Sequence, residues 1–468
     1  MALVFRQLLT EAIGDASYLV GDDSARVCAV VDPQVDIDRY LDAAREQGLA
    51  IRYVIQTHTH EDFVSGATAL AARAPGAEVC VSGHAEDSYG FAHRALRDGD
   101  RLDLGAVRLQ VRHTPGHTPE HIALLVSKTS EEQPFAVLSG GALLVGTAGR
   151  TDLLGPERAG ELTHRQFETL HHVFLQLPDG VLVYPTHVHG SPCGAAIGDK
   201  PCTSIAQEKA TNELLRQGDE ASFRKAALGG LPPKPSYYPR LKETNTGGTE
   251  AKATPPVAPL APEDFARAAA KGDAVVVDTR QMLAFGGGHI PGALNFGAAG
   301  HLAIQAGWML DPSRPILLVL EKDAQLDSVV TELARTGFTR FDGYLAGGMT
   351  AWENAGLPLQ PLPQVHVREL AKSIDEDPAR LAVLDVRAPH EWEDGHVPGA
   401  THVFLPELPK SLSRLSKDRP VAVYCDSGYR ASIAASLLQA HGYDARNVPG
   451  SWQAWQACGL PVEKPGRT

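Results

Sequence analysis

Two histidines and two acidic residues are packed into one short stretch near the start of the chain. The stretch reads Thr57-His58-Thr59-His60-Glu61-Asp62-Phe63 and follows the apolar run Tyr53-Val54-Ile55. Imidazole nitrogens suit zinc and iron, and a carboxylate can bind such an ion or orient its ligands. The pattern therefore indicates a metal-binding loop at the end of a strand.

Two later clusters also place histidines in strand–loop segments. They are His113-Thr114-Pro115-Gly116-His117-Thr118-Pro119-Glu120-His121 and Tyr184-Pro185-Thr186-His187-Val188-His189-Gly190. A lone histidine is more often a satisfied polar residue, but three clusters of this kind are typical of a metal site assembled by folding.

A second segment whose residues could take part in a reaction surrounds a cysteine near the C-terminus. The apolar run Pro420 to Tyr424 is followed by Cys425-Asp426-Ser427-Gly428-Tyr429-Arg430 and then by a helical pattern from Ala431 to His441. Backbone N–H groups and the helix dipole favour an anion at such a position, Gly428 permits a tight loop, and Arg430 adds positive charge. The loop suits a thiolate nucleophile or a cysteine persulfide; the alternative is an inert cysteine at a strand end.

The elements that must position these residues fall into four parts. Short β-rich runs and helical stretches alternate in residues 1–241, and residues 242–262 are rich in Thr, Gly, Pro and Ala, which indicates a linker. An internal repeat comes next, since Val275 to Arg280 matches Ala382 to Arg387. We therefore expect two small parallel-sheet α/β domains, at 263–362 and 363–468.

Composition limits the function classes. The chain has 468 residues and a net charge of −13 with no basic block, so we expect neither nucleic acid nor a membrane as a partner. No apolar run is long enough to span a bilayer, and the first residues lack a signal pattern, so a cytoplasmic location is expected. The six cysteines are too scattered for a disulfide framework.

The C-terminal repeat resembles the rhodanese family over its whole length. The motifs that carry the resemblance are Leu384-Asp385-Val386-Arg387, Glu391, Gly395-His396-Val397-Pro398-Gly399-Ala400, the loop from Cys425 to Arg430, and Gly450 to Trp455. The resemblance implies sulfane-sulfur transfer through a persulfide on Cys425. The middle repeat resembles the same family, but Leu320 falls opposite Cys425 and no arginine follows, so we interpret it as a non-catalytic, structural or docking domain.

The N-terminal part resembles the metallo-β-lactamase superfamily, and within it persulfide dioxygenases fused to rhodanese domains. The matching segments are Thr57 to Gly66, His113 to Thr118, Gly149-Arg150-Thr151-Asp152-Leu153 and Gly190-Ser191-Pro192-Cys193-Gly194. The resemblance implies an αββα sandwich. Phe63 stands where hydrolytic members have a further histidine, which argues against a two-zinc hydrolase.

The resemblance also implies one Fe(II) per chain, held by His58, His117 and an aspartate. His60, Asp62 and His187 would orient the ligands or act as substitute ligands. Arg150 would contact the carboxylate of a carrier thiol. Cys193 is interpreted either as a sulfur relay or as an ordinary loop thiol.

The expected aspartate is missing, because Gly141 occupies its position. Three outcomes remain open: Asp62 or His187 completes the site, the iron is held loosely with water or an anion, or oxygenation has been lost.

The sequence predicts an enzyme of sulfide and persulfide metabolism. It would oxidise a thiol persulfide, on glutathione, CoA or a similar carrier, to sulfite. It would couple this step to sulfur transfer through Cys425, with sulfite or thiosulfate as small-molecule partners, and we expect a homo-oligomer. The alternatives are a sulfurtransferase with a degenerate N-terminal domain and a non-enzymatic sulfide sensor.

Overall fold

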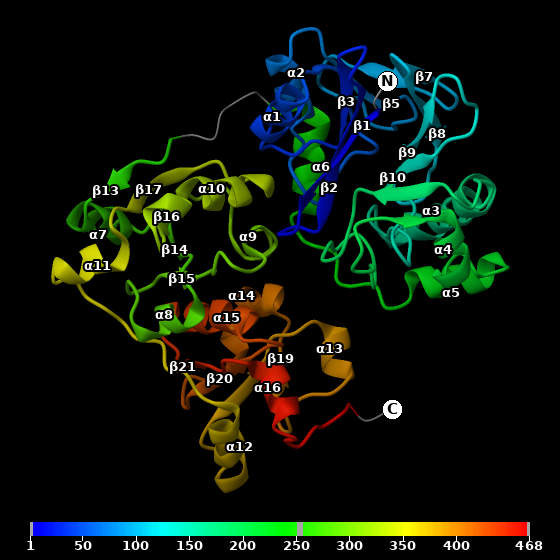
Figure 1. The fold of residues 1–468 in the computed structure, drawn as a ribbon. Helices are drawn as coiled ribbons and strands as arrows, with labels where there is room; N and C mark the ends of the chain where they lie inside the picture. Colours follow the sequence, from blue (N-terminus) through cyan, green and yellow to red (C-terminus); the bar gives the residue numbers. More distant parts are fainter. Residues whose placement is uncertain (1–2, 250–255, 466–468) are drawn as a thin grey trace. The chain divides into compact units, whose positions relative to one another are not determined.

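The computed structural model describes residues 3–249 and 256–465 (Figure 1). The chain forms two compact units: the first comprises residues 1–253 with 334–337, and the second comprises 254–333 and 338–468. Within the described ranges, no helix is both long enough and apolar enough to cross a bilayer.

The first unit is built on two sheets, each six-stranded within residues 3–249. The first sheet has the order β1-β2-β3-β4-β5-β6. Its strands are β1 (Leu3–Thr10), β2 (Asp15–Asp22), β3 (Val27–Val31), β4 (Ala50–Ile55), β5 (Glu78–Ser82) and β6 (Arg94–Leu96). The second sheet has the order β12-β11-β10-β9-β8-β7. Its strands are β7 (Arg101–Leu104), β8 (Val107–His113), β9 (Ile122–Lys128), β10 (Ala136–Gly140), β11 (Leu182–Pro185) and β12 (Thr203–Ser204).

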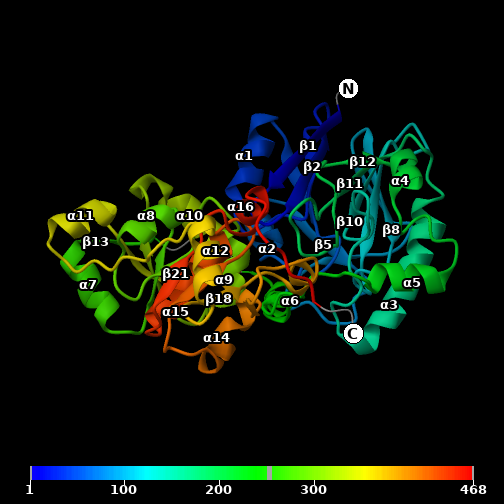
Figure 2. The same cartoon turned by 90° about the horizontal axis from the view of Figure 1, so that it is seen from below.

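Helices cover the outer faces of the two sheets (Figure 2). They are α1 (Asp38–Glu46), α2 (Ala67–Arg73), α3 (Pro156–Thr169), the π-helix η1 (Leu170–Phe174), α4 (Ile205–Thr211) and α5 (Glu220–Leu228). Helix α6 (Tyr238–Gly247) instead contacts the segment after β4 through Asn245. Helix α1 buries Tyr40, Ala43 and Ala44, whose spacing places them on one face. A separate core, including Tyr18, Leu109 and Leu124, fills the space between the sheets. The predicted αββα sandwich is confirmed.

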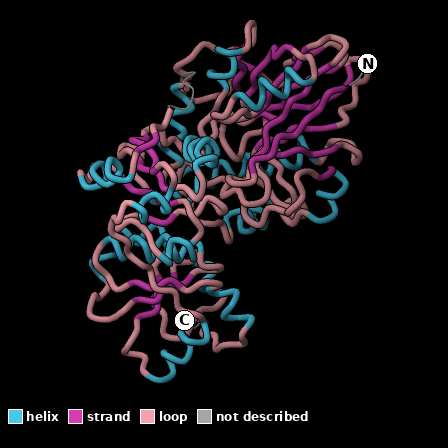
Figure 3. The backbone as a smooth tube through the Cα atoms, turned by 60° about the vertical axis from the view of Figure 1, so that its left-hand side comes forward, coloured by secondary structure: helices cyan, strands magenta, loops and turns pink. Residues whose placement is uncertain are grey.

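The second unit contains two parallel-sheet modules, with helices flanking each sheet (Figure 3). The middle module has the strand order β13-β17-β16-β14-β15. Its elements are β13 (Pro259–Leu260), α7 (Pro262–Ala270), β14 (Val275–Asp278), α8 (Met282–Gly287), β15 (Leu294–Asn295), α9 (Leu302–Met309), β16 (Ile316–Val319), the 3-10 helix η2 (Asp323–Gln325), α10 (Leu326–Arg335), β17 (Phe341–Leu345) and α11 (Gly348–Asn354).

The C-terminal module has the strand order β19-β18-β20-β21. Its elements are α12 (Val367–Glu376), β18 (Ala382–Asp385), α13 (Pro389–Glu393), β19 (Thr401–His402), η3 (Leu405–Glu407), α14 (Leu408–Ser411), η4 (Leu412–Arg414), β20 (Val421–Tyr424), α15 (Tyr429–Ala440), β21 (Ala445–Asn447) and α16 (Ser451–Ala457). All strand pairs in both modules are parallel, as predicted. One apolar core, including Leu318 and Val423, spans the two modules.

The expected linker at 242–262 needs correction at both ends. Residues 242–247 belong to α6, and Pro259–Leu260 form β13. The physical reason at the first end is Asn245, which is buried: its amide donates to the carbonyls of His60 (2.8 Å) and Phe63 (2.7 Å). The Thr- and Gly-rich composition concealed this support for the first histidine loop. Residues 250–255 lie outside the described ranges.

Candidate functional site

The predicted metal-site histidines lie just beyond strand ends in the first unit. His58 follows β4, His117 follows β8, and His187 follows β11. All three side chains are buried, and the ring centroids of His58, His117 and His187 lie 4.9–5.3 Å apart. Folding therefore brings the three sequence clusters to one point.

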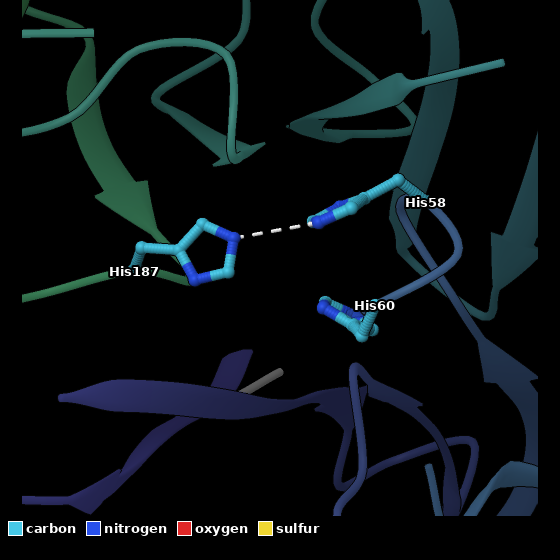
Figure 4. Close-up of side chains that lie close together, drawn as sticks. All are labelled: His58, His60 and His187. Carbon is cyan, nitrogen blue, oxygen red and sulfur yellow. Dashed lines mark hydrogen bonds between the residues drawn. The ribbon is translucent and has the colours of Figure 1, made fainter. Parts of the chain in front are cut away.

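His187 connects the other histidines to a pair of carboxylates. Its Nε2 lies 3.4 Å from Nε2 of His58 (Figure 4). Its Nδ1 lies 2.8 Å from Oδ1 of Asp15 and 3.1 Å from Oδ2 of Asp62. Carboxylates behind an imidazole fix the ring and its tautomer, so Nε2 of His187 is directed into the cluster.

His117 is held in a similar way by a backbone carbonyl. Its Nδ1 lies 2.8 Å from the carbonyl oxygen of Arg150, which leaves Nε2 available as a ligand atom. Burial lowers the pKa of His117 to about 3 and that of His58 well below its ordinary value, and neighbouring histidines add to both shifts. Both imidazoles are therefore neutral near pH 7, the form that binds metals.

His60 lies between two acidic side chains without a well-aligned hydrogen bond. Its Nε2 is 3.0 Å from Oδ1 of Asp32, its Nδ1 is 3.8 Å from Oδ1 of Asp62, and its ring stacks on Phe63 at 4.3 Å between centroids. Both His60 ring nitrogens are buried and lack a hydrogen-bond partner within the described part of the chain. Figure 4 shows the ring beside His58 and His187.

Two buried carboxylates of the site, Asp15 and Asp32, escaped the sequence analysis. Asp32 follows β3 with φ 51°, and its carboxylate accepts hydrogen bonds from Thr57 N (2.7 Å) and Thr186 Oγ1 (2.5 Å). It thus joins the first and third histidine segments. The apolar run Val27–Val31 ending in Asp32-Pro33 was the available signal for Asp32, and no pattern marked Asp15.

The second candidate site is the loop between β20 and α15. Cys425 follows β20 directly and is buried, and the N–H of Gly428 donates to its Sγ at 3.1 Å. Gly428 has φ 111°, a conformation that an L side chain rarely adopts, and it precedes the first turn of α15. The backbone therefore presents a donor to the sulfur, as predicted for a loop that stabilises an anion.

The backbone of Cys425 is anchored by a residue from the start of α16. Ser451 Oγ accepts a hydrogen bond from Cys425 N (3.1 Å) and donates to the carbonyl of Val448 (2.6 Å). Ser451 has φ 42°, which is uncommon for a residue other than glycine. Its hydroxyl gives a reason for this conformation, because it pairs the N–H of the cysteine.

Arg430 is fixed by Glu391 in a two-point ion pair. Its Nη1 and Nη2 donate to Oε2 and Oε1 of Glu391 at 2.6 and 2.7 Å. Burial alone would lower the pKa of Arg430, but the bond to Glu391 and the nearby Cys425 raise it, so the guanidinium keeps its charge. Its geometry is set before any substrate arrives.

A cavity of about 620 Å³ opens beside this loop, and both modules line it. The loop and α15 contribute residues that include Asp426, Ser427 and Arg430, and the middle module contributes Gln281, Met282, His301 and Gln305 among others. The middle module is thus part of the surroundings of the cysteine loop, although it carries no thiol at the equivalent position.

Comparison with known proteins identifies the N-terminal part. The Metallo-beta-lactamase superfamily matches residues 14–130. A probable metallo-hydrolase of Burkholderia pseudomallei is 30% identical over 234 residues, covering 43% of this chain and 77% of the relative. The chain belongs to the metallo-β-lactamase superfamily.

Further similarities support the division of the chain into domains. The rhodanese-like domain family matches residues 261–355 and 366–458. The mitochondrial persulfide dioxygenase ETHE1 of Homo sapiens is 29% identical over 190 residues, 40% of this chain and 70% of the relative. A crystal structure of a metallo-beta-lactamase from Staphylococcus aureus is similar with TM-score 0.67 and 27% identity, covering 74% of this chain and 99% of that one. The architecture is therefore a metallo-β-lactamase domain followed by two rhodanese-like domains.

Gly141 decides how well the metallo-β-lactamase domain fits the iron set that the resemblance implies. A Cβ added at Gly141 would lie 2.3 Å from Cδ2 of His117, so the histidine ring fills the space of a side chain there. The Gly141 N–H donates to Nε2 of His121 at 2.8 Å. Position 141 thus supplies no carboxylate, and the residues present do not fit an iron set of two histidines and one carboxylate from this position.

Arg150 and Cys193 are both buried within the metallo-β-lactamase domain. Arg150 is 2% exposed, pairs with both oxygens of Asp152 (2.7 and 2.9 Å) and donates to the carbonyl of Pro192. Its guanidinium is engaged inside the metallo-β-lactamase domain rather than presented to a carrier thiol. Cys193 is 1% exposed, and its Sγ lies 3.6 Å from Oδ2 of Asp62. It is therefore a buried neighbour of the histidine cluster.

Proposed function

We propose that the protein is a sulfurtransferase of persulfide metabolism, with Cys425 as the sulfur carrier. The observation that carries the proposal is the 3.1 Å hydrogen bond from Gly428 N to Cys425 Sγ at the start of α15. A donor aimed at the sulfur favours the thiolate, which is the nucleophile in sulfur chemistry. The match to the rhodanese-like domain family over residues 366–458 supports the same function.

The transfer is a pair of displacements at sulfur. The Cys425 thiolate attacks the outer sulfur of a persulfide R–S–SH, the S–S bond of the donor breaks, and RS⁻ leaves as Cys425–S–SH forms. Sulfite then attacks the outer sulfur of this persulfide, which releases the Cys425 thiolate, thiosulfate and a proton. No external oxidant or reductant is needed, because the sulfane sulfur keeps its oxidation state.

Arg430 and the adjoining cavity define what the loop can accept. The guanidinium, fixed by Glu391, lines the cavity and offers positive charge to an anionic donor or acceptor such as a thiol persulfide or sulfite. The cavity of about 620 Å³ has room for a small carrier such as glutathione. The middle module would then contact the substrate, because its residues line one side of the cavity.

Sulfur transfer from glutathione persulfide to sulfite, measured as thiosulfate formed, tests the proposal. We expect Cys425→Ser, or alkylation of Cys425, to abolish transfer by the full chain. Cys458→Ser is a matched control, because Cys458 is a partly exposed thiol at the end of α16 in the same module. Transfer that survives in Cys425→Ser would refute the assignment.

Persulfide oxidation in the metallo-β-lactamase domain is a second candidate function. The similarity to a persulfide dioxygenase and the convergence of His58, His117 and His187 favour it, while Gly141 weighs against it. Oxygen uptake on glutathione persulfide, with about one iron per chain, would support oxidation. Unchanged oxygen levels with intact sulfur transfer would leave the transferase as the function of the chain.

A further inference from the structure

A methionine of the middle module packs against the loop that presents Cys425. A Cβ added at Gly428 would lie 2.9 Å from Sδ and 3.1 Å from Cε of Met282, so the thioether lies directly against this glycine. Gly428 is the residue whose N–H donates to Cys425 Sγ, at 3.1 Å. Met282 therefore contacts the residue that carries the hydrogen-bond donor for the sulfur, in addition to lining the cavity beside the loop.

The thioether of Met282 is itself restrained by a polar contact. Asn447 ends β21, which pairs with the cysteine strand β20, and its Nδ2 donates to Sδ of Met282 at 3.7 Å and to Oε1 of Gln364 at 2.9 Å. Methionine side chains are flexible and often serve only to fill gaps in a core. Because a donor restrains this one, half-buried at the start of α8, it can act as a fixed support for the loop.

The residue after Gly428 is also seated by the middle module. A Cβ added at Gly300 would lie 2.8 Å from Cε2 and Cζ of the Tyr429 ring, whereas one added at Gly297 would lie 3.5 Å from Cε2, an ordinary contact distance. The lack of a side chain at Gly300 therefore leaves room for the ring. Tyr429 is the first residue of α15, so this seat helps to fix the start of the helix next to the cysteine loop.

Two hydrogen bonds join the next turns of α15 to the middle module. Ser432 Oγ donates to Oδ1 of Asn295 at 2.5 Å, and the Asn295 N–H donates to Oγ of Ser436 at 3.0 Å. The side-chain amide of Asn295 in turn donates to the carbonyls of Asp278 and Arg280, at the end of β14. The helix that follows the cysteine loop is thus tied to a strand end of the module that lacks a thiol.

We propose that the middle module positions the Cys425 loop for sulfur transfer: Met282 keeps the Gly428 N–H directed at the sulfur, and the space at Gly300 seats Tyr429. This inference rests on the proposed transferase function, because it assigns both residues a part in that reaction. Glycine has the widest range of backbone conformations, so Gly428 without its support would turn its N–H away from the sulfur for part of the time. Met282 is then a positioning residue that acts through Gly428.

Steady-state transfer from glutathione persulfide to sulfite by Met282→Ala separates positioning from substrate contact. Positioning predicts that kcat falls by about tenfold, the effect of weakening one hydrogen bond to a charged group, with KM for the persulfide within about twofold of wild type. Met282→Leu keeps most of the side-chain volume and should recover most of the lost kcat. A raised KM at unchanged kcat in Met282→Ala, or no recovery in Met282→Leu, would overturn the proposal.

Amide hydrogen exchange in the peptide that contains Gly428 tests the same support in the full chain without a sulfur substrate. Met282→Ala and Gly300→Ala should each speed this exchange by about tenfold, because each loosens the loop locally. Gly287→Ala is the matched control and should keep the wild-type rate, since a Cβ there meets no atom within 4 Å. A wild-type rate in either test variant would overturn the proposal. Exchange does not depend on transfer, so a chain whose transfer survives in Cys425→Ser would refute the transferase and leave this measurement unaffected.

Discussion

The middle and C-terminal modules have the same framework but differ at the loop after the central strand. In both, an aspartate at the end of a strand pairs with the arginine two residues later, Asp278 with Arg280 and Asp385 with Arg387, each at 2.6 Å. Val319 pairs with Asp278 and Tyr424 with Asp385, so Leu320 and Cys425 occupy equivalent positions.

The segment after that position differs between the modules in how the following helix begins. After Cys425, α15 begins at Tyr429 and the Gly428 N–H is aimed at the sulfur. After Leu320, the 3-10 helix η2 intervenes and α10 begins only at Leu326. The comparison shows that the same framework places a backbone N–H on the Cys425 sulfur in one module while the helix starts differently in the other, so the helix start is a feature in which the two loops differ.

The largest effect should come from moving the thiol between modules. In a Cys425→Ser chain, adding Leu320→Cys should leave sulfur transfer at background, at least about 1000-fold below wild type, because the nucleophile is present but unactivated. Thiosulfate formation measures it. Appreciable recovery of transfer would mean that the loop geometry matters less than the thiol itself.

The shared ion pairs should contribute strongly to stability in both modules. Asp278→Ala and Asp385→Ala each leave a largely buried guanidinium unpaired, which costs about 3–5 kcal/mol of unfolding free energy. Asp385→Ala should cost more, since Tyr424 Oη also donates to Asp385 at 2.5 Å. Urea unfolding of the full chain measures both, and equal costs would contradict the difference.

Releasing Arg430 should slow transfer without removing the nucleophile. Glu391→Gln breaks the two-point ion pair, and we expect kcat/KM to fall by about tenfold, equivalent to about 1.4 kcal/mol of transition-state stabilisation. Glu393→Gln, at an exposed position of the same helix, is the matched control. Unchanged kinetics in Glu391→Gln would show that the pair does not position Arg430 for the reaction.

The smallest effect concerns a buried histidine of the middle module. Burial lowers the pKa of His289 from 6.5 to about 4, so the folded state keeps it neutral while the unfolded chain takes up a proton below pH 6.5. Stability therefore falls on acidification through this window, by about 1 kcal/mol between pH 7 and 5.5.

Unfolding of His289→Gln at these two pH values should show a smaller decrease than wild type. His390→Gln, at an exposed position in α13, should retain the wild-type dependence. Identical pH dependence in wild type and His289→Gln would contradict the prediction.

The sequence predicted the candidate sites well where their residues lie in one contiguous motif. The three histidine segments, the Cys425 loop and the internal repeat each occupy a short run, and the structure confirms that the histidines converge and that both repeats form parallel sheets. The contact of Asp15 with His187 was not predictable in the same way, because no motif marks Asp15 and an isolated bridge between the start of β2 and the segment after β11 brings it there.

Amino-acid composition predicted the structure less well than the motifs did. The stretch from Lys242 onward resembles a linker in its residue content, yet Asn245 satisfies three backbone groups of the first histidine loop: Ser65 N and the carbonyls of His60 and Phe63. A single buried amide outweighs the low helix propensity of its neighbours because unpaired backbone groups in the core are costly.

Ser451 combines an unusual backbone conformation, with φ 42°, with a hydrogen bond to the backbone of Cys425. The middle module has Gly348, with φ 59°, at the matching position, where the conformation costs little. A non-glycine residue in this region typically carries about 1–3 kcal/mol of strain. Ser451→Gly would relieve this strain, but it would also remove the hydroxyl that pairs the Cys425 N–H, and an unpaired buried donor costs about 1–3 kcal/mol. At this residue, relief of backbone strain and loss of a buried hydrogen bond therefore act on stability in opposite directions.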